Sequence, residues 1–258
     1  MDAIVTAGGI PEPGDPLYEY TQGQEKALLP IAGKPMIQWV LDALCLSESV
    51  ERVIVIGLND DTNISCSKLV AFLPSHGEML DNIRAGTKKL LEFNPQVNHV
   101  MVVSSDIPAI TTLMIDWVAQ AVQETDHDVY YNVVSREAME TRFPNSKRSY
   151  LKLKDVEVCG GDLNAFRAQS VFNNLEIWDR IIGSRKNVLK QASLIGFDTL
   201  ILVMLHALTL DKAAKLASKR LGLTGRAIQC PFAEIAMDVD KPHQLEIMQA
   251  HLSQLNPA

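Results

Sequence analysis

Cysteine is scarce in this sequence, and its spacing excludes the sites that cysteines usually build. The four residues Cys45, Cys66, Cys159 and Cys230 are far apart, and no CxxC pair occurs. Structural zinc sites and disulfide frameworks both require paired or regularly spaced cysteines. We therefore expect small apolar side chains or free thiols in a reducing compartment.

Long apolar runs are also absent. The longest, residues 200–208, contains His206 and is far shorter than the roughly 20 residues that a membrane span requires. The N-terminus has no basic segment of the kind that opens a secretory signal peptide, and glycine appears by Gly8. These absences predict a cytoplasmic protein with no membrane span.

Positive charge is in deficit. The chain has 24 Lys and Arg residues against 31 Asp and Glu residues, a formal net charge of −7. Because a general nucleic-acid binder carries a basic footprint, we expect no nucleic-acid partner. The 258 residues suffice for one large α/β domain or two small ones, whose core needs no disulfide or metal to stabilise it.

Two common phosphate-binding loops are missing as well. The sequence has no GxxxxGK[ST], and its first glycine pair lacks the spacing of GxGxxG. The first absence argues against a P-loop enzyme, and the second argues against a dinucleotide-dependent oxidoreductase.

The first half of the chain alternates short apolar runs with helical patterns. Apolar, β-branched runs predict strands at residues 3–6, 52–57, 69–73 and 99–104. Between them, helical spacing predicts helices at residues 35–46, 78–93 and 111–123, the last with Thr111 as N-cap. Continuously apolar strands separated by helices are typical of a mostly parallel sheet covered on both faces. The expected class is a Rossmann-like α/β fold.

The pattern changes after Asp128. Strands are expected at residues 129–134, 150–153, 157–159 and 226–230, without full helices between the first three. Residues 173–222 are expected to be mainly helical, with Thr209 as an N-cap and Gly222 as a stop, and a last helix is expected over 241–252. No linker separates the parts. We therefore expect one domain over 1–258, with halves 1–128 and 129–258 and a helical insertion in the second half.

A glycine-rich loop follows the first predicted strand. Ala7, Gly8 and Gly9 stand where an open α/β sheet binds its ligands, at the carboxyl end of a strand. Glycines there let the backbone approach phosphate oxygens, and Lys26 supplies a point charge downstream. The alternative is a plain surface loop between strand and helix.

Two segments of this opening region resemble a known signature. Residues 5–9 (VTAGG) and 26–36 (KALLPIAGKPM) are similar to that of the sugar-phosphate and cofactor nucleotidyltransferases. The strongest likeness is to the MobA-like branch, which contains molybdenum-cofactor guanylyl- and cytidylyltransferases. The sequence departs from the pattern at Glu25, where the family has proline, and in having no arginine before Arg52.

The resemblance implies a fold and a reaction. The fold would be the mixed, mostly parallel sheet of the nucleotide-diphospho-sugar transferase type. The enzyme would use Mg²⁺ to transfer a nucleoside monophosphate from an NTP, with CTP or GTP favoured, to a phosphorylated small-molecule acceptor, releasing pyrophosphate. Ala7, Gly8 and Gly9 would contact the nucleotide, and Lys26 would act on its phosphates.

Three aspartates are candidate metal ligands. Asp106, in the segment SSDIP after the strand 99–104, resembles the family's D-x-P element, whose aspartate holds Mg²⁺; a turn former or helix cap is the alternative. Asp238 and Asp240 resemble the family's D-x-D ending, and alternation in an extended segment would point both to one side. Alternatively, Asp240 caps the last helix. Mg²⁺ usually takes only one or two carboxylates together with phosphates.

The candidates for nucleobase recognition lie in residues 75–86. By the resemblance, Gly77, Asp81 and Asn82 would contact the nucleotide. The alternative is an ordinary helix start, at which acidic residues are favourable.

The candidates for the acceptor lie later. In residues 158–164, Gly160 and Gly161 would let the acceptor approach the backbone closely, and Asp162 and Asn164 would form hydrogen bonds with it. The alternative is an ordinary strand-to-helix turn capped by Asp162. Residues 136–154 carry six basic residues against two acidic ones, and Arg148 among them could grip a phosphate. The alternative is a solvated basic face.

Two other function classes stay open. The missing loop arginine suits a non-catalytic module that binds a nucleotide or nucleotide sugar. A metal-dependent glycosyltransferase would use Asp106 as its metal aspartate, although no D-x-D follows the strand 99–104.

Overall fold

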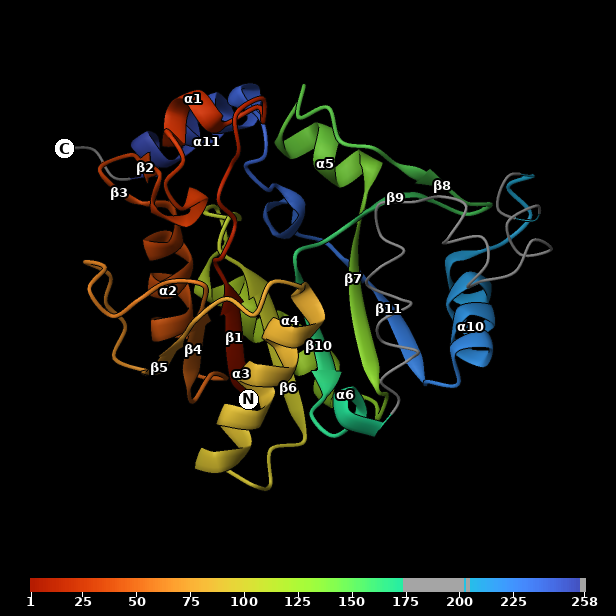
Figure 1. Cartoon of the computed structure of the whole chain (residues 1–258). Helices are drawn as coiled ribbons and strands as arrows, with labels where there is room; N and C mark the ends of the chain where they lie inside the picture. The colour runs from red at the N-terminus through yellow and green to blue at the C-terminus, as the bar shows by residue number, and fades with distance from the viewer. Residues whose placement is uncertain (174–201, 203–204, 256–258) are drawn as a thin grey trace.

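The computed structural model describes residues 1–173, 202 and 205–255, and a nine-stranded mixed sheet crosses that part of the chain (Figure 1). Its order is β5-β4-β1-β6-β10-β7-β9-β8, with β11 also paired to β7. Four strands of the first half are parallel neighbours: β1 (Asp2–Thr6), β4 (Val53–Ile56), β5 (Leu69–Leu73) and β6 (His99–Ser104). The α/β class and the parallel core expected from the sequence are confirmed.

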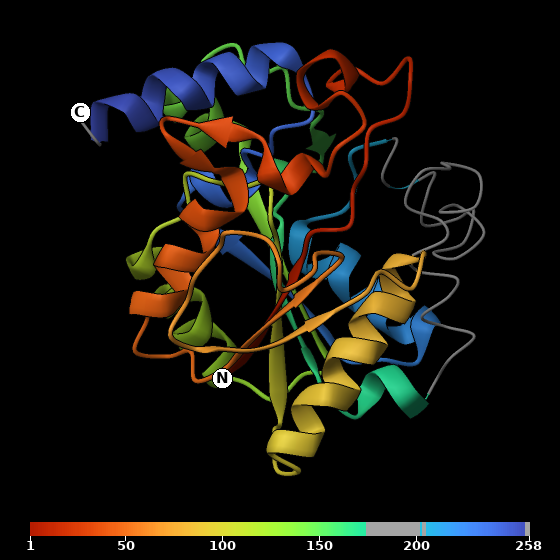
Figure 2. The same ribbon diagram turned by 60° about the vertical axis from the view of Figure 1, so that its left-hand side comes forward.

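The central parallel strands β1, β4 and β6 are buried on both faces, whereas β5 lies at the edge of the sheet and is partly exposed. In β1, Ala3 and Val5 belong to one apolar cluster, whereas Ile4 belongs to another with Ile54 and Ile56. Figure 2 shows α2 (Met36–Leu46) and α4 (Thr112–Gln123) on one side of the sheet and the helices α3 (Met79–Phe93), α6 (Ser170–Asn173) and α10 (Leu210–Leu221) on the other.

Close packing on the second face depends on one small residue. A Cβ on Gly86 of α3 would lie 2.8 Å from Cδ1 of Ile4 and 2.9 Å from Cδ1 of Ile56. The glycine therefore lets α3 approach the sheet directly behind the strands that carry the glycine loop.

The second half adds both parallel and antiparallel strands. They are β7 (Val129–Ser135), β8 (Leu151–Lys152), β9 (Glu157–Gly160), β10 (Leu163–Arg167) and β11 (Gly225–Cys230). β11 is parallel to β7, whereas β10 is antiparallel to both β6 and β7 and lies between them. Because β10 pairs with β6, the sheet continues across the boundary between the two halves.

β10 corrects one expectation. The alternative of a strand-to-helix turn capped by Asp162 is wrong, because residue 162 leads into a strand. Leu163, Ala165 and Phe166 are buried, and the first two join the apolar cluster opposite to that of Phe166. Burial on both sheet faces thus outweighs the local turn signal of Gly160 and Gly161.

The C-terminal helices begin and end largely as expected. The Thr209 side chain accepts a hydrogen bond from the backbone N–H of Lys212, and Gly222 ends α10 in the left-handed conformation. The last helix, α11 (Pro242–Leu255), overlaps the predicted range 241–252. Of the predicted helical region 173–222, residues 174–201 and 203–204 lie outside the described residues.

Short elements at the carboxyl edge of the parallel strands complete the framework of the site. They are α1 (Tyr18–Thr21), η1 (Lys26–Leu28), β2 (Pro30–Ile31), β3 (Lys34–Pro35), α5 (Arg136–Arg142) and η2 (Ala233–Ala236). In the described part of the chain, no helix is both long enough and apolar enough to cross a membrane. A cytoplasmic location and a single domain over the whole chain stay predictions.

Candidate active site

The glycine loop lies at the carboxyl ends of β1 and β4. The backbone N–H of Ala7 donates to Ile56 O at 2.8 Å, which aligns the two strand ends. Gly57 has a φ of +100°, and a Cβ on it would lie 2.3 Å from both Cα and N of Gly8. A Cβ on Gly8 would in turn lie 3.1 Å from Oγ of Ser75, whereas Gly9 faces open space. The two strand ends therefore meet backbone to backbone, with an open side at Gly9.

Gly57 is a site residue that the sequence analysis missed. A signal was present, since Gly57 is the last residue of the second predicted strand, at the same edge of the sheet as Gly8, which closely follows the first. Its importance depends on contact with a residue 49 positions earlier in the chain, which local patterns do not reveal.

Lys26 joins this loop to two carboxylates. Its backbone N–H donates to Gly9 O at 2.8 Å. Its Nζ lies 2.5 Å from Oδ2 of Asp106 and 2.6 Å from Oδ1 of Asp240, and its side chain is 17% exposed. Burial lowers the pKa of Lys26, but the charges and hydrogen bonds of the two aspartates outweigh it and raise that pKa above its ordinary value. The lysine is therefore a permanent cation held between two anions.

Asp106 is fixed by contacts on both carboxylate oxygens. Ser104 Oγ donates to Oδ1 at 2.5 Å, and Lys26 occupies Oδ2. The backbone O of Asp106 accepts from the N–H of Val239 at 2.9 Å, which places the segment carrying Asp238 and Asp240 beside it. Residues from three distant parts of the sequence thus meet at one point.

Asp240 and Asp238 contact different cations. Asp240 faces Lys26, which outweighs burial and lowers the pKa of Asp240. Its backbone N–H donates to Gln244 Oε1 at 3.0 Å at the start of α11. Asp238 instead forms an ion pair with Arg148. Burial, with a further contribution from neighbouring carboxylates, raises the pKa of Asp238 to about 8 against the opposing effect of Arg148.

The three candidate metal ligands do not form one acidic cluster. Across residues 1–173, 202 and 205–255, no group of three or more His, Cys, Asp and Glu side chains is arranged to hold a metal ion. The physical reason is that each aspartate faces a basic side chain, Lys26 or Arg148. Asp238 and Asp240 pair with different basic side chains, Arg148 and Lys26, but the two carboxylates are close enough for each to shift the pKa of the other. A metal ion shared by Asp238 and Asp240 stays a prediction. Asp106 and Asp240, by contrast, both contact the ammonium group of Lys26.

Arg148 is the basic residue of the 136–154 stretch that reaches this region. Besides Asp238, its Nη2 donates to Gly160 O at 3.3 Å and lies 3.9 Å from Oδ2 of Asp162. Its side chain is 16% exposed. The pairs made by other members of the stretch lie elsewhere: Arg136–Glu157, Lys152–Glu157 and Arg142–Glu234. Arg148, the member of the stretch that the sequence analysis singled out, therefore lies beside Asp238, whereas Arg136, Arg142 and Lys152 form ion pairs elsewhere.

A break between β9 and β10 orients the acceptor candidates. The N–H of Gly161 donates to Asn132 O at 2.8 Å, and the Asn164 amide donates to Gly161 O and accepts from the N–H of Asn132, both at 2.8 Å. Asp162 donates its N–H to Ile235 O at 2.7 Å. Asn164 thus holds the backbone of the break, while Gly160 and Asp162 meet Arg148.

The candidate base-recognition loop adjoins the glycine loop through Ser75. Gly77 has a φ of +87°, and Asn82 Oδ1 accepts from the N–H of His76 at 2.7 Å. Asn82 therefore fixes the loop from the first turn of α3. Asp81 is exposed and lies 3.5 Å from Arg84 Nη1.

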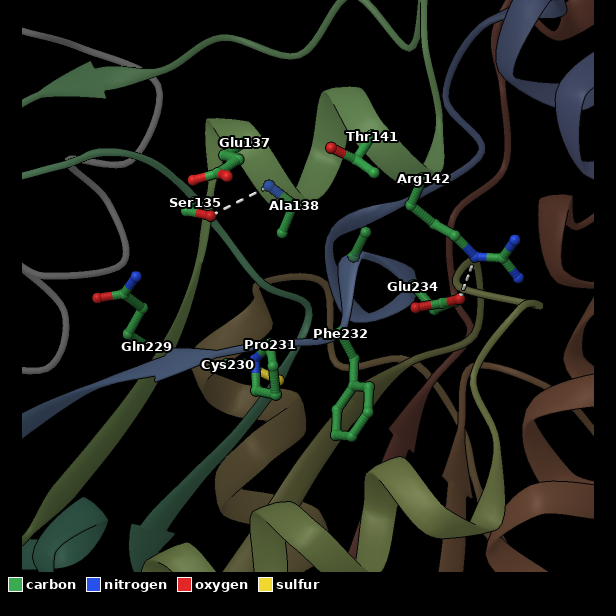
Figure 3. A pocket seen from close by; sticks show the side chains of 11 residues that line it. Ser135, Glu137, Ala138, Thr141, Arg142, Gln229, Cys230, Pro231, Phe232 and Glu234 are labelled. Atoms are coloured by element: carbon green, nitrogen blue, oxygen red, sulfur yellow. Dashed lines mark hydrogen bonds and ion pairs between the residues drawn. The ribbon is translucent and has the colours of Figure 1, made fainter.

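A separate cavity of about 760 Å³ lies between α5 and the segment from β11 to η2 (Figure 3). Arg142 Nε and Glu234 Oε1 form an ion pair 2.7 Å long at its side. The described residues that line this cavity include none of the site residues predicted from the sequence. η2 contacts both regions, because Ala233 and Glu234 line the cavity and Ile235 O accepts a hydrogen bond from the N–H of Asp162.

Known structures share this architecture. A hypothetical transferase from Thermus thermophilus is 29% identical, with a TM-score of 0.81 over 95% of this chain and 98% of that one. CMP:2-keto-3-deoxy-manno-octonic acid synthetase complexed with CTP is 17% identical, with a TM-score of 0.60 over 99% and 98%. 4-Diphosphocytidyl-2C-methyl-D-erythritol synthase from Anaerococcus prevotii DSM 20548 is 11% identical, with a TM-score of 0.59 over 98% and 95%. The last two show the fold alone.

The sequence itself also matches a protein family. No curated protein matches the chain, but residues 17–220 match the MobA-like NTP transferase domain. The match begins after Gly8 and Gly9, so the case for these glycines depends on the geometry at β1 and β4 and on their resemblance to the family signature. The chain belongs to the MobA-like NTP transferase family of nucleotidyltransferases, as residues 26–36 indicated.

Proposed function

We propose that this nucleotidyltransferase is Mg²⁺-dependent and transfers a nucleoside monophosphate from CTP or GTP to a phosphorylated small-molecule acceptor. The observation that carries the proposal is the position of Lys26, held between Asp106 and Asp240 beside the glycine loop. Two similar structures are described as a synthetase complexed with CTP and a diphosphocytidyl synthase, which favours CTP.

The reaction needs no protein nucleophile. An oxygen of the acceptor phosphate forms a bond to the α-phosphorus of the NTP, and the bond from that phosphorus to the bridging oxygen breaks. Pyrophosphate leaves with the electron pair of the broken bond. Catalysis of such a displacement consists mainly of positioning and charge stabilisation. The open side of the loop at Gly9 and the ammonium of Lys26 would supply both at the phosphates.

The donor set suits magnesium. Asp106 and Asp240 direct carboxylate oxygens at one positive charge, and Mg²⁺ prefers oxygen ligands, with one or two carboxylates sufficient when phosphates supply the rest. When bound there, Mg²⁺ would neutralise charge on the phosphates. Lys26 would then exchange a carboxylate partner for a phosphate oxygen, and Ser104 would keep Asp106 oriented.

The test is a screen of CTP, GTP, UTP and ATP with Mg²⁺, first for a thermal shift and then for pyrophosphate release with phosphorylated acceptors. We expect one NTP to raise Tm selectively and to release pyrophosphate in step with product. Release of NDP from a nucleotide sugar would instead indicate a glycosyltransferase. Binding of an NTP without pyrophosphate release from any acceptor would indicate a non-catalytic binding module.

We place the acceptor phosphate at Arg148, next to Gly160 and Asp162. Arg148→Lys keeps the charge but removes the planar fork that grips phosphate with two hydrogen bonds. We expect the KM for the acceptor to rise about tenfold, which corresponds to about 1.4 kcal/mol of binding, while the KM for the NTP stays unchanged. Steady-state kinetics with each substrate varied in turn measures both constants.

The matched control is Arg136→Lys. Arg136 belongs to the same basic stretch but pairs with Glu157, and its side chain is 57% exposed. It should leave both KM values at the wild-type level. An equal rise in both KM values for Arg148→Lys would contradict this placement of the acceptor.

A further inference from the structure

Two cysteines that are far apart in the sequence meet on the surface beside α2. Cys45 lies in the last turn of α2, and Cys66 lies in the connection between β4 and β5. The Cys45 and Cys66 side chains are close enough for each to shift the pKa of the other. Next to them, the N–H of Ser67 donates to Cys45 Sγ at 3.2 Å, and Ser67 Oγ lies 3.0 Å from the same sulfur.

The last part of the connection that carries Cys66, residues 65–68, is held against α2 and the residue that follows it. Gln38 Nε2 donates to Ser65 O at 2.8 Å, and Gln38 Oε1 accepts from the N–H of Ser65 at 2.9 Å. At its far end, Lys68 Nζ donates to Ser47 O. These contacts on both sides of Cys66 hold its backbone beside the last turn of α2, which carries Cys45.

We propose that Cys45 and Cys66 form a reversible dithiol–disulfide pair that exchanges with low-molecular-weight disulfides. Both side chains are partly exposed, whereas Cys159 and Cys230 are buried at 5% and 1% exposure. All four cysteines are free thiols in this structure. The proposal concerns a surface away from Lys26 and Asp106, and it is independent of the transferase reaction.

The surroundings assign the two thiols different roles. Hydrogen bonds from Ser67 lower the pKa of Cys45, because they stabilise its thiolate. Burial raises the pKa of Cys66 to about 11. Since the thiolate is the attacking species in disulfide exchange, Cys45 attacks first and Cys66 completes the exchange.

The exchange balances in two steps. The Cys45 thiolate attacks one sulfur of a disulfide RSSR, forms the mixed disulfide Cys45–S–S–R, and expels RS⁻, which takes up the proton that Cys45 lost. Cys66 then loses its proton and attacks the Cys45 sulfur, expelling the second RS⁻, which takes up that proton. Two electrons pass from the protein dithiol to RSSR, and the products are one intramolecular disulfide and two RSH.

The experiment incubates the full chain with oxidised glutathione, blocks the remaining thiols, and maps the digest by mass spectrometry. We expect a cross-linked peptide joining Cys45 to Cys66, the loss of two thiols, and reversal by excess reduced glutathione. Cys159→Ser is the matched control and should retain the cross-link. Failure of wild type to form the Cys45–Cys66 link would overturn the proposal.

Single substitutions test the order of attack. Cys66→Ser should trap one glutathione on Cys45, because the second attack is missing. Cys45→Ser should leave Cys66 largely unmodified over the same time. Far-UV circular dichroism confirms that each variant is folded. A folded Cys66→Ser variant without an adduct on Cys45 would contradict the proposal, as would equal modification of Cys159 and Cys230 in wild type.

Discussion

Replacing Asp106 with asparagine is expected to leave the chain folded and to lower the rate of pyrophosphate release by about a thousandfold, or about 4 kcal/mol of transition-state stabilisation. Asp106 presents one oxygen to Ser104 and the other to Lys26. Asparagine has almost the same shape but no charge, and its amide nitrogen cannot accept from either donor. It therefore removes both the anion that positions Lys26 and a ligand that Mg²⁺ would use.

The measurement is kcat for pyrophosphate release at saturating Mg²⁺–NTP, with circular dichroism and Tm recorded on the same preparation. Asp60→Asn is the control: it makes the same chemical change at an exposed position on the β4–β5 connection. It should retain the wild-type kcat. A folded Asp106→Asn variant with near-wild-type turnover would remove Asp106 from the catalytic machinery.

Replacing Gly57 with alanine is expected to lower the free energy of unfolding and to abolish the thermal shift caused by NTP. The φ of +100° is unfavourable for alanine and costs about 1–3 kcal/mol. The new Cβ would also fall 2.3 Å from the backbone of Gly8, and relieving such overpacking typically costs a further 1–3 kcal/mol or so. Because the obstacle is backbone, the relief must move the glycine loop itself.

Gly14 supplies a control that separates these two costs. Its φ is +102°, but a Cβ there would meet nothing within 4 Å. Gly14→Ala should therefore show the conformational cost alone and keep the NTP-induced thermal shift. Urea unfolding gives the free energies, and thermal shift with NTP reports the loop. Equal effects of the two substitutions on both measurements would mean that the close approach of Gly57 to Gly8 is unimportant.

The elements that the sequence predicted well are those whose signal is local. The strand His99–Ser104 has the predicted bounds, and α3 begins one residue later than expected. A continuous apolar run predicts the bounds of a strand, and apolar residues at helical spacing over the 15 residues of α3 predict the bounds of a helix. β10 was missed because it is set between β6 and β7, whose paired residues lie about 60 and 35 positions earlier, and three of its five residues are buried there.

The site residues, too, were predicted where a local motif marks them and missed where they depend on contacts between distant parts of the chain. Residues 26–36 identified the family, and Lys26, Asp106 and Asp240 were named individually from motifs. Which basic residue of the 136–154 stretch faces Asp238 could not be predicted, because the choice of Arg148 depends on how the chain folds around Gly160. The same limit concealed the contact between Gly57 and Gly8 and the meeting of Cys45 with Cys66.

The two ion pairs of Lys26 also determine at which point of protein synthesis the site can be completed. One partner, Asp106, lies 80 residues further along the chain, but the other, Asp240, lies 214 residues further. The segment of Asp240 is in addition anchored to Asp106 through Val239. A nascent chain that ends after β6 and Asp106 therefore holds a glycine loop whose lysine has only one of its two carboxylate partners. The ribosome must therefore release the chain through Asp240 before this binding surface acquires its final charge.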